Sequence, residues 1–172
     1  MMAGIKIMFV GLLLWATIIL AIGGQLGFID NIDLIFHEAG HIIFHFFGDF
    51  ISTLGGSLMQ ILIPLICFGY FLLRQQLFAS SFCGWWLGQN LINVSVYIGD
   101  TRARELYLIG PPGATHDWYW LLNRMDKLAQ DTQIANAVWW IGVIIMVASL
   151  LFALYAIWWH RQKIKQLDSQ EI

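Results

Sequence analysis

The chain has 172 residues, of which 59% are apolar and only 12% are charged. An ordinary soluble domain carries about twice that share of charged residues, so the composition excludes a disordered chain and indicates a membrane protein. A net charge of -2 gives no strong field to gather nucleic acid, and we expect no nucleic-acid partner. Two cysteines are too few for a disulfide framework. The length fits one integral membrane domain over residues 1–172.

Long apolar segments predict an all-α membrane helix bundle with four spans. A spanning helix needs about 20 mostly apolar residues. The segments that meet this need are residues 7–28, 51–73, 77–99 and 134–159. We interpret the first as a retained anchor, because its apolar run exceeds the about 7–15 residues of a typical signal peptide. The last span ends in an aromatic belt and a basic tail, which is typical of a membrane boundary.

A shorter apolar segment over residues 32–47 predicts a further helix, which contains three histidines and a glutamate. Asp30 or Asn31 can cap its start, and Gly48 can end it. Its length of about 16 residues corresponds to about 24 Å. That length is marginal for a span, so the helix either crosses the membrane or enters it and returns as a re-entrant segment.

The polar region between the third and fourth spans ends in a predicted amphipathic helix over residues 117–130. Thr115 or Asp117 can cap its start. Apolar residues recur there at the spacing of one helical face: Trp118, Leu121, Leu122, Met125 and Leu128. With aromatic residues at its start, this helix is expected to lie in the membrane interface.

One short motif suggests chemistry: His37-Glu38-Ala39-Gly40-His41 is an H-E-x-x-H sequence on the predicted short helix. Residues four apart lie on one helical face, so both imidazoles can reach one zinc ion. Glu38 stands beside them, where it can accept a proton from an activated water. Two histidines and a glutamate are costly to place in an apolar helix, so the motif favours a zinc site with Glu38 as catalytic base.

A catalytic zinc site usually has three protein ligands and keeps one position for water. The third ligand must therefore come from elsewhere in the chain, and two residues are candidates. Asp100 ends the third predicted span, and His116 stands just before the interfacial helix. Either residue or both can complete the site, and binding by both would close it. Asn93 lies on the same helical stripe as Asp100 and is a candidate donor to an oxyanion.

These motifs resemble the site-2 protease family of intramembrane zinc metallopeptidases, over residues 30–100. In that family a first core helix carries H-E-x-x-H, and a later helix carries an Asn followed by Leu-Asp-Gly. Here Asn93 or Asn90 precedes Gly99-Asp100-Thr101. The resemblance implies a small, divergent member in which Asn93 or Asn90 helps to hold substrate and Glu38 is the base. The zinc ligands that it implies are His37, His41 and Asp100.

The sequence therefore predicts a zinc-dependent membrane metallopeptidase that hydrolyses a peptide bond of a membrane protein or peptide in or near the bilayer. The alternative is a non-catalytic membrane protein, or a subunit of a membrane complex, with a structural zinc site. Membrane lipid surrounds the protein in either case. In the re-entrant arrangement, five Lys and Arg residues lie on the side of the termini against four on the site side. This bias favours a multi-pass protein of the bacterial inner (plasma) membrane with cytoplasmic termini.

Overall fold

The computed structural model describes residues 2–106 and 116–168, and every regular element in these residues is helical. The helices are α1 (Met2–Ala21), α2 (Gly27–Phe44), α3 (Asp49–Leu73), α4 (Leu77–Gly99), α5 (Asp117–Arg124) and α6 (Asp131–Asp168). Two short 3-10 turns, η1 (His45–Phe47) and η2 (Leu128–Gln130), follow α2 and precede α6. The all-helical part of the sequence prediction is confirmed.

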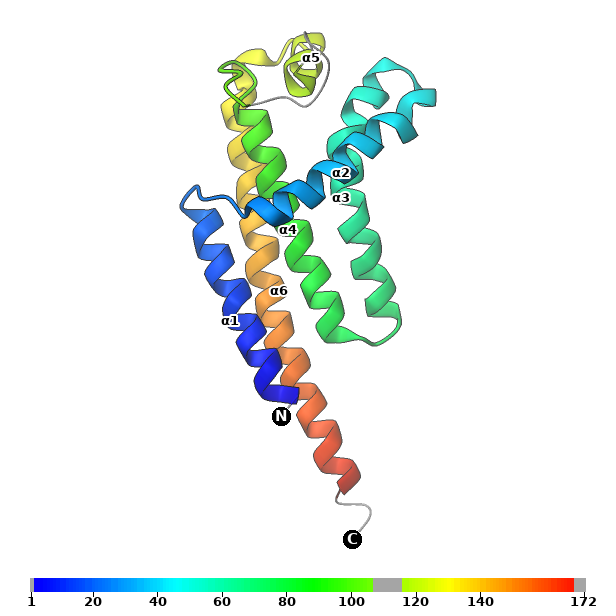
Figure 1. Cartoon of the computed structure of the whole chain (residues 1–172), viewed down its shortest axis with the longest axis vertical. Helices are drawn as coiled ribbons and strands as arrows, with labels where there is room; N and C mark the ends of the chain where they lie inside the picture. Colours follow the sequence, from blue (N-terminus) through cyan, green and yellow to red (C-terminus); the bar gives the residue numbers. More distant parts are fainter. Residues whose placement is uncertain (1, 107–115, 169–172) are drawn as a thin grey trace.

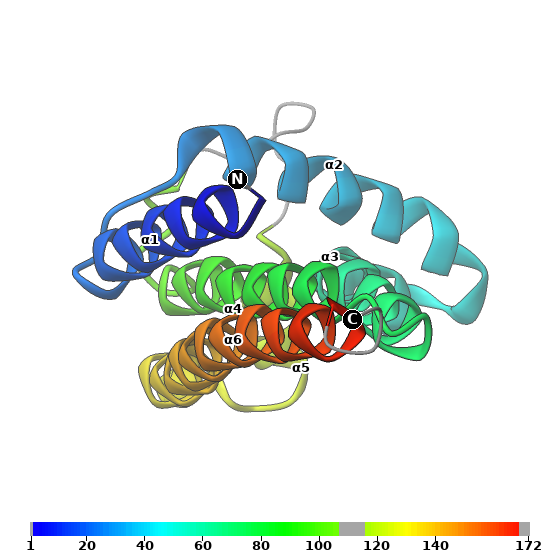
Figure 2. The ribbon, with the colours of Figure 1, turned by 90° about the horizontal axis from the view of Figure 1, so that it is seen from below.

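The long helices α1, α3, α4 and α6 run along the long axis of the molecule, and α2 crosses them obliquely (Figure 1). Both termini and the turn between α3 and α4 lie at one end, whereas α5 lies at the other. Viewed from below, α4 lies between α2 on one side and α6 on the other (Figure 2). A residue on α4 can therefore contact both the oblique helix and the long C-terminal helix.

Three helices are long and apolar enough to cross a membrane: Gly4–Ala21 in α1, Asp49–Leu73 in α3, and Leu128–Leu167, which includes α6. This agrees with a membrane protein. The 23-residue helix α4 is not among the three. Buried polar side chains such as Gln89 and Asn90 interrupt its apolar sequence. A fourth span through α4 therefore remains a prediction.

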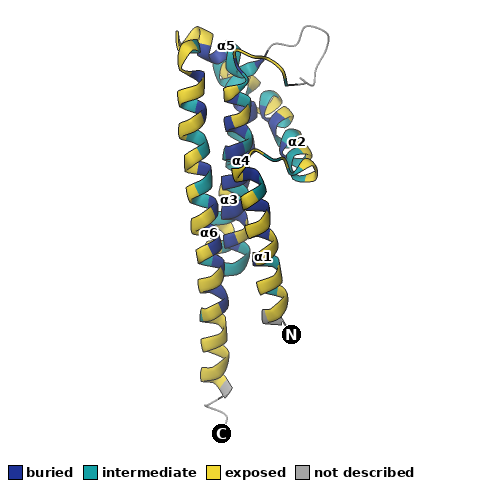
Figure 3. Cartoon of the chain, turned by 90° about the vertical axis from the view of Figure 1, so that its left-hand side faces the viewer, coloured by how far each residue is buried: buried dark blue, intermediate teal, exposed yellow. Residues whose placement is uncertain are grey.

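The core of the bundle is the contact between α4 and α6, and α4 is the most buried of the long helices (Figure 3). Two glycines, Gly88 on α4 and Gly142 on α6, let the helices approach closely because neither has a Cβ. A Cβ on Gly88 would lie 2.7 Å from the carbonyl oxygen of Gly142, and a Cβ on Gly142 would lie 2.7 Å from the carbonyl oxygen of Gly88. Trp85 and Met146 fill the core beside this contact. The Trp85 indole also donates to the Thr17 hydroxyl over 2.9 Å, which joins α1 to the pair.

The helix boundaries around α2 differ from those predicted by the sequence. α1 ends at Ala21, because the backbone turns at Gly23, which has a φ of +84°. α2 then begins at Gly27, five residues earlier than expected, with Leu26 rather than Asp30 or Asn31 at the N-cap. Asp30 still contributes to this start, because its carboxylate accepts the Leu26 N–H over 2.9 Å.

The predicted helix over residues 117–130 is shorter in the structure and does not continue into α6. α5 ends at Arg124, and Asp126 adopts a left-handed φ of +57°, which breaks the helix before η2 begins. His116, rather than Asp117, is the N-cap of α5. Thr115, the other predicted cap, lies outside the described residues.

Candidate metal centre

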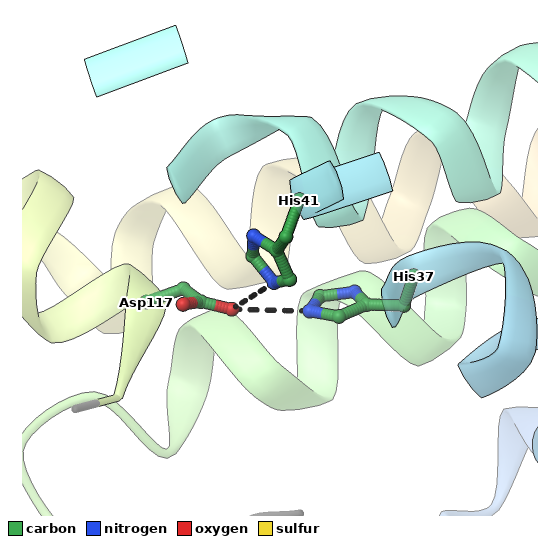
Figure 4. A group of neighbouring side chains, drawn as sticks. All are labelled: His37, His41 and Asp117. Carbon is green, nitrogen blue, oxygen red and sulfur yellow. Dashed lines mark hydrogen bonds and ion pairs between the residues drawn. The ribbon is translucent and has the colours of Figure 1, made fainter. Parts of the chain in front are cut away.

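Three potential metal ligands meet where α5 approaches the middle of α2. His37 and His41 extend from successive turns of α2, and Asp117 extends toward both from the first position of α5 (Figure 4). Asp117 Oδ2 lies 3.0 Å from His37 Nε2 and 3.2 Å from His41 Nε2. The ligand atoms of the three residues all lie within 4.8 Å of one another. Within the described residues, these three form the one such group of His, Cys, Asp or Glu side chains.

Hydrogen bonds on the far side of each imidazole orient its Nε2 atom toward the centre. His41 Nδ1 lies 2.9 Å from the backbone oxygen of Ser52, which can only accept, so Nδ1 carries the proton. His37 Nδ1 faces the amide oxygen of Gln60 at 3.2 Å. Outer partners of this kind fix the tautomer and ring orientation of metal-binding histidines. Both rings then direct an Nε2 lone pair toward Asp117.

The chemistry of this donor set calls for a positive charge at its centre. Two imidazole lone pairs and a carboxylate oxygen are all acceptors, and they repel one another unless a proton or a cation lies between them. In the described part of the chain, no lysine or arginine forms an ion pair with Asp117. Two histidine nitrogens and one carboxylate are ligands that suit zinc and leave a coordination position open. The three residues therefore fit a zinc ion.

Gly56 on α3 keeps the space beside the two imidazoles free. A Cβ at this position would lie 2.6 Å from His37 Nε2 and 2.7 Å from His41 Nε2. Any side chain larger than hydrogen would thus occupy the place at which the lone pairs converge. α3 can approach α2 this closely because Gly55, the residue before Gly56, packs against Gly40 of α2.

Tyr97 on α4 holds Asp117 in position through two contacts. Its hydroxyl accepts the Asp117 backbone N–H over 3.1 Å and donates to Asp117 Oδ2 over 3.3 Å. Burial raises the pKa of the Asp117 carboxyl, but the His37 and His41 imidazoles, which donate to it when they hold a proton on Nε2 in place of a metal, outweigh this effect and lower the pKa to about 2. Asp117 is therefore ionised at neutral pH, as a metal ligand must be.

The structure places Asp100 and His116, the two ligands suggested by the sequence, against each other. His116 Nδ1 accepts the Tyr119 N–H over 3.2 Å, so the ring proton sits on Nε2, which faces Asp100 Oδ2 at 3.3 Å. Burial lowers the pKa of His116 more than Asp100 raises it. Asp100 also accepts the backbone N–H groups of Glu105 and Leu106. These contacts secure the N-terminal end of α5 beside α4 and so help to place Asp117.

Glu38 is exposed on α2, and its charge acts on His41. Within the described residues it makes no hydrogen bond or ion pair, so its carboxylate is available to a bound molecule. Asn93 is engaged elsewhere: its amide oxygen accepts from Gln60 Nε2 over 2.8 Å, and its nitrogen faces Asp30 at 3.4 Å. In this arrangement Asn93 contacts the residue behind His37 rather than the open side of the centre.

Sequence reasoning did not select three residues that shape this centre: Asp117, Gln60 and Tyr97. The sequence indicates Asp117 only as a possible helix cap, because no spacing rule connects it with the two histidines. A signal for Gln60 was present, since it is the one amide in the apolar segment 51–73, where polar side chains are costly. Tyr97 gave no comparable signal, because aromatic residues are frequent throughout the chain.

The chain matches no protein-family model, no curated protein and no solved structure. The geometry of the centre and the membrane character of the helices are therefore the features that indicate a function.

Proposed function

We propose that this protein is a zinc-dependent metallopeptidase of the membrane, with His37, His41 and Asp117 as zinc ligands. The observation that carries the proposal is the convergence of two imidazole Nε2 atoms on one carboxylate oxygen, at 3.0 and 3.2 Å. The outer hydrogen bonds from Gln60 and Ser52, together with the space beside Gly56, support a metal rather than a fortuitous contact.

Glu38 is the proposed general base of the reaction. Zinc in such a site supplies Lewis-acid chemistry, which acidifies water and polarises the scissile carbonyl. Glu38 follows ligand His37 directly, is exposed, and makes no hydrogen bond or ion pair with the described residues. It would accept one proton from the attacking water and return it to the leaving amine as the C–N bond breaks. Metal binding alone would not require this carboxylate.

The proposed substrate is a peptide bond of a membrane protein or peptide, in or near the bilayer. Three apolar candidate spans belong to the same bundle as the centre, which forms where α5, at one end of the molecule, approaches α2. Such a centre can meet a substrate that is anchored in the same membrane. This placement is similar to that expected from the site-2 protease resemblance, with Asp117 proposed in the role that the resemblance gives to Asp100.

The proposed location is the bacterial inner (plasma) membrane, with both termini in the cytoplasm. The end of the molecule that carries the termini also carries the turn between α3 and α4 (Figure 1). Five of the nine Lys and Arg residues belong to these segments: Lys6, Arg74, Arg161, Lys163 and Lys165. An excess of such residues is typical of cytoplasmic segments. The metal centre would then face the opposite side.

A structural zinc site in a non-catalytic membrane protein or complex subunit is the second candidate. The observation that favours it is the position of Asp117 on α5, which contacts α3 through the Trp118 indole and the Ser57 hydroxyl at 3.0 Å. A zinc ion would join α5 to α2 and strengthen this connection. Under this alternative Glu38 has no role.

Substitution of Glu38 separates the two functions. The full-length chain in lipid nanodiscs is assayed for zinc content and for cleavage of an unfolded protein and of single-span membrane peptides. We expect Glu38→Gln to retain zinc and to lose cleavage by about 100-fold or more. Glu105→Gln is the matched control, because Glu105 is also exposed but lies outside the centre. Cleavage that survives Glu38→Gln would refute Glu38 as the general base, whereas a wild type that holds zinc but cleaves neither substrate would favour the structural alternative.

A further inference from the structure

A chain of side-chain hydrogen bonds connects His37 with Asp30, two turns earlier on α2. Gln60 on α3 contacts His37 Nδ1 through its oxygen at 3.2 Å. Its nitrogen donates to the Asn93 oxygen on α4 over 2.8 Å, and the Asn93 nitrogen faces Asp30 Oδ1 at 3.4 Å. We call these four residues the amide chain. From Asp30 on α2, the chain passes through Asn93 on α4 and Gln60 on α3, and it returns to α2 at His37.

The amide chain can be polarised in two directions. Each amide has a donor end and an acceptor end, so a flip of one amide forces the other to flip as well. In the first direction Gln60 presents its oxygen to His37, and the imidazole proton lies on Nδ1. In the reverse direction Gln60 presents its NH2 group, and the proton moves to Nε2. That proton would point at Asp117 and occupy the position of a metal.

Asp30 distinguishes the two directions because a carboxylate can only accept hydrogen bonds. Its oxygens already face donors from the Leu26 backbone and from Gln89, at 2.9 and 3.1 Å. A reversed chain would place the Asn93 oxygen against a carboxylate oxygen. Gln60 is only 2% exposed, so water cannot easily replace a lost bond there. The Asp30 carboxylate therefore favours the first direction, whereas Asp117, which faces Nε2 at 3.0 Å, favours the reverse direction when no metal is bound.

We propose that Asp30 is a positioning residue for the metal centre: through Asn93 and Gln60 it holds His37 in the Nδ1–H tautomer, with the Nε2 lone pair free for a metal. This inference deepens the proposed function, and its effect on zinc rests on His37 being a ligand. Loss of an outer partner of a metal-binding histidine typically lowers metal affinity about 10–100-fold. Asp30 acts over three hydrogen bonds, so we expect an effect near the lower limit.

The test measures the tautomer of His37 in metal-free Asp117→Ala protein, because without a metal the Asp117 carboxylate favours a proton on the Nε2 atom that it faces at 3.0 Å. Full-length chain with 15N-labelled histidine is studied by NMR in nanodiscs at a pH where the imidazoles are neutral, and His37→Gln identifies the His37 signals. In the Asp117→Ala background we expect the Nδ1–H form while Asp30 is intact and a shift toward the Nε2–H form when Asp30→Asn is added, because an amide at position 30 can either donate or accept.

A double variant that moves the carboxylate from position 30 to position 93 of the amide chain should restore the original tautomer of His37. In the double variant Asp30→Asn/Asn93→Asp, the new carboxylate can only accept from Gln60, so the Nδ1–H form should return. Asp33→Asn is the matched control, because it makes the same change at a buried carboxyl on α2 that lies outside the amide chain. Asn93→Leu interrupts the chain while Asp30 is kept, and it should reproduce the effect of Asp30→Asn if that variant folds poorly.

Zinc affinity, measured by competition with a chelator, is the second readout. We expect Asp30→Asn to bind zinc about 10-fold more weakly and the double variant to recover most of this loss. An unchanged His37 tautomer in Asp30→Asn or Asn93→Leu overturns the inference, as does a double variant that fails to restore it. A protein that shows the Nδ1–H form in the Asp117→Ala background but binds no zinc when Asp117 is intact refutes the proposed metal function and leaves the positioning by Asp30 intact.

Discussion

Asp117 Oδ2 lies 3.0 Å from His37 Nε2, although 80 positions separate the two residues in the chain. The contact forms because α5 folds against α3 and α4, where Tyr97 binds both the backbone and the carboxylate of Asp117. The histidines of one helix thus acquire a carboxylate from a short helix at the end of the bundle.

Replacing this carboxylate tests the proposed ligand set. We expect Asp117→Ala to weaken zinc binding by more than the about 10–100-fold that an outer partner contributes, because a direct ligand is lost. Asp100→Asn should retain zinc but lower the free energy of unfolding by about 1–3 kcal/mol, since Asp100 accepts two backbone N–H groups. Zinc binding that disappears in Asp100→Asn and persists in Asp117→Ala would reverse the assignment in favour of Asp100.

Gly56 should be essential for metal binding although it has no side chain. The methyl group of Gly56→Ala would lie 2.6 Å from His37 Nε2 and 2.7 Å from His41 Nε2, so we expect loss of zinc from a protein that still folds. Gly69→Ala on the same helix is the control, because a Cβ there meets nothing within 4 Å. Equal zinc content in the two variants, measured by elemental analysis, would show that the metal does not occupy this space.

Asp33 on α2 is expected to carry a proton. Its side chain is fully buried, and one oxygen accepts the Trp86 indole N–H over 2.9 Å. The other oxygen is buried and makes no hydrogen bond within the described residues. A buried carboxylate oxygen without a partner is costly while it is charged, and one proton on Asp33 removes that charge.

Asparagine at position 33 imitates the protonated acid, so Asp33→Asn should change the free energy of unfolding by less than about 1 kcal/mol. Asp33→Leu loses the Trp86 hydrogen bond and should cost more, by about 1–3 kcal/mol. Thermal unfolding in nanodiscs, followed by circular dichroism, measures both. A large destabilisation in Asp33→Asn would indicate that the ionised carboxylate is needed.

The contact between α4 and α6 depends on small residues. A Cβ at Gly142 would lie 2.7 Å from the Gly88 carbonyl oxygen, which belongs to a rigid backbone. We therefore expect Gly142→Val to destabilise the bundle by about 1–3 kcal/mol through overpacking. Gly11→Val on α1 provides the comparison, because a Cβ there meets nothing within 4 Å. Similar melting temperatures for the two variants would argue against close packing at Gly142.

Much of the helical architecture follows from local features of the sequence. Apolar length predicts α1, α3 and α6, because the apolar character of a spanning helix is a property of neighbouring residues. The boundaries were less predictable. α2 starts at Gly27 because the chain turns at Gly23 and the carboxylate of Asp30 accepts the Leu26 N–H, and neither event changes the apolar pattern.

The sequence by itself determined that His37 and His41 share one face of a helix, since four residues make about one turn and the motif lies within that turn. Only the tertiary structure decided which carboxylate faces them. Asp100, His116 and Asp117 are close in sequence, yet the pairing of Asp100 with His116 leaves Asp117 directed at the histidines. The orientation of Nε2 and the space beside it also depend on Gln60 and Gly56 of α3. Contacts between different helices follow from packing, which spacing along one helix does not encode.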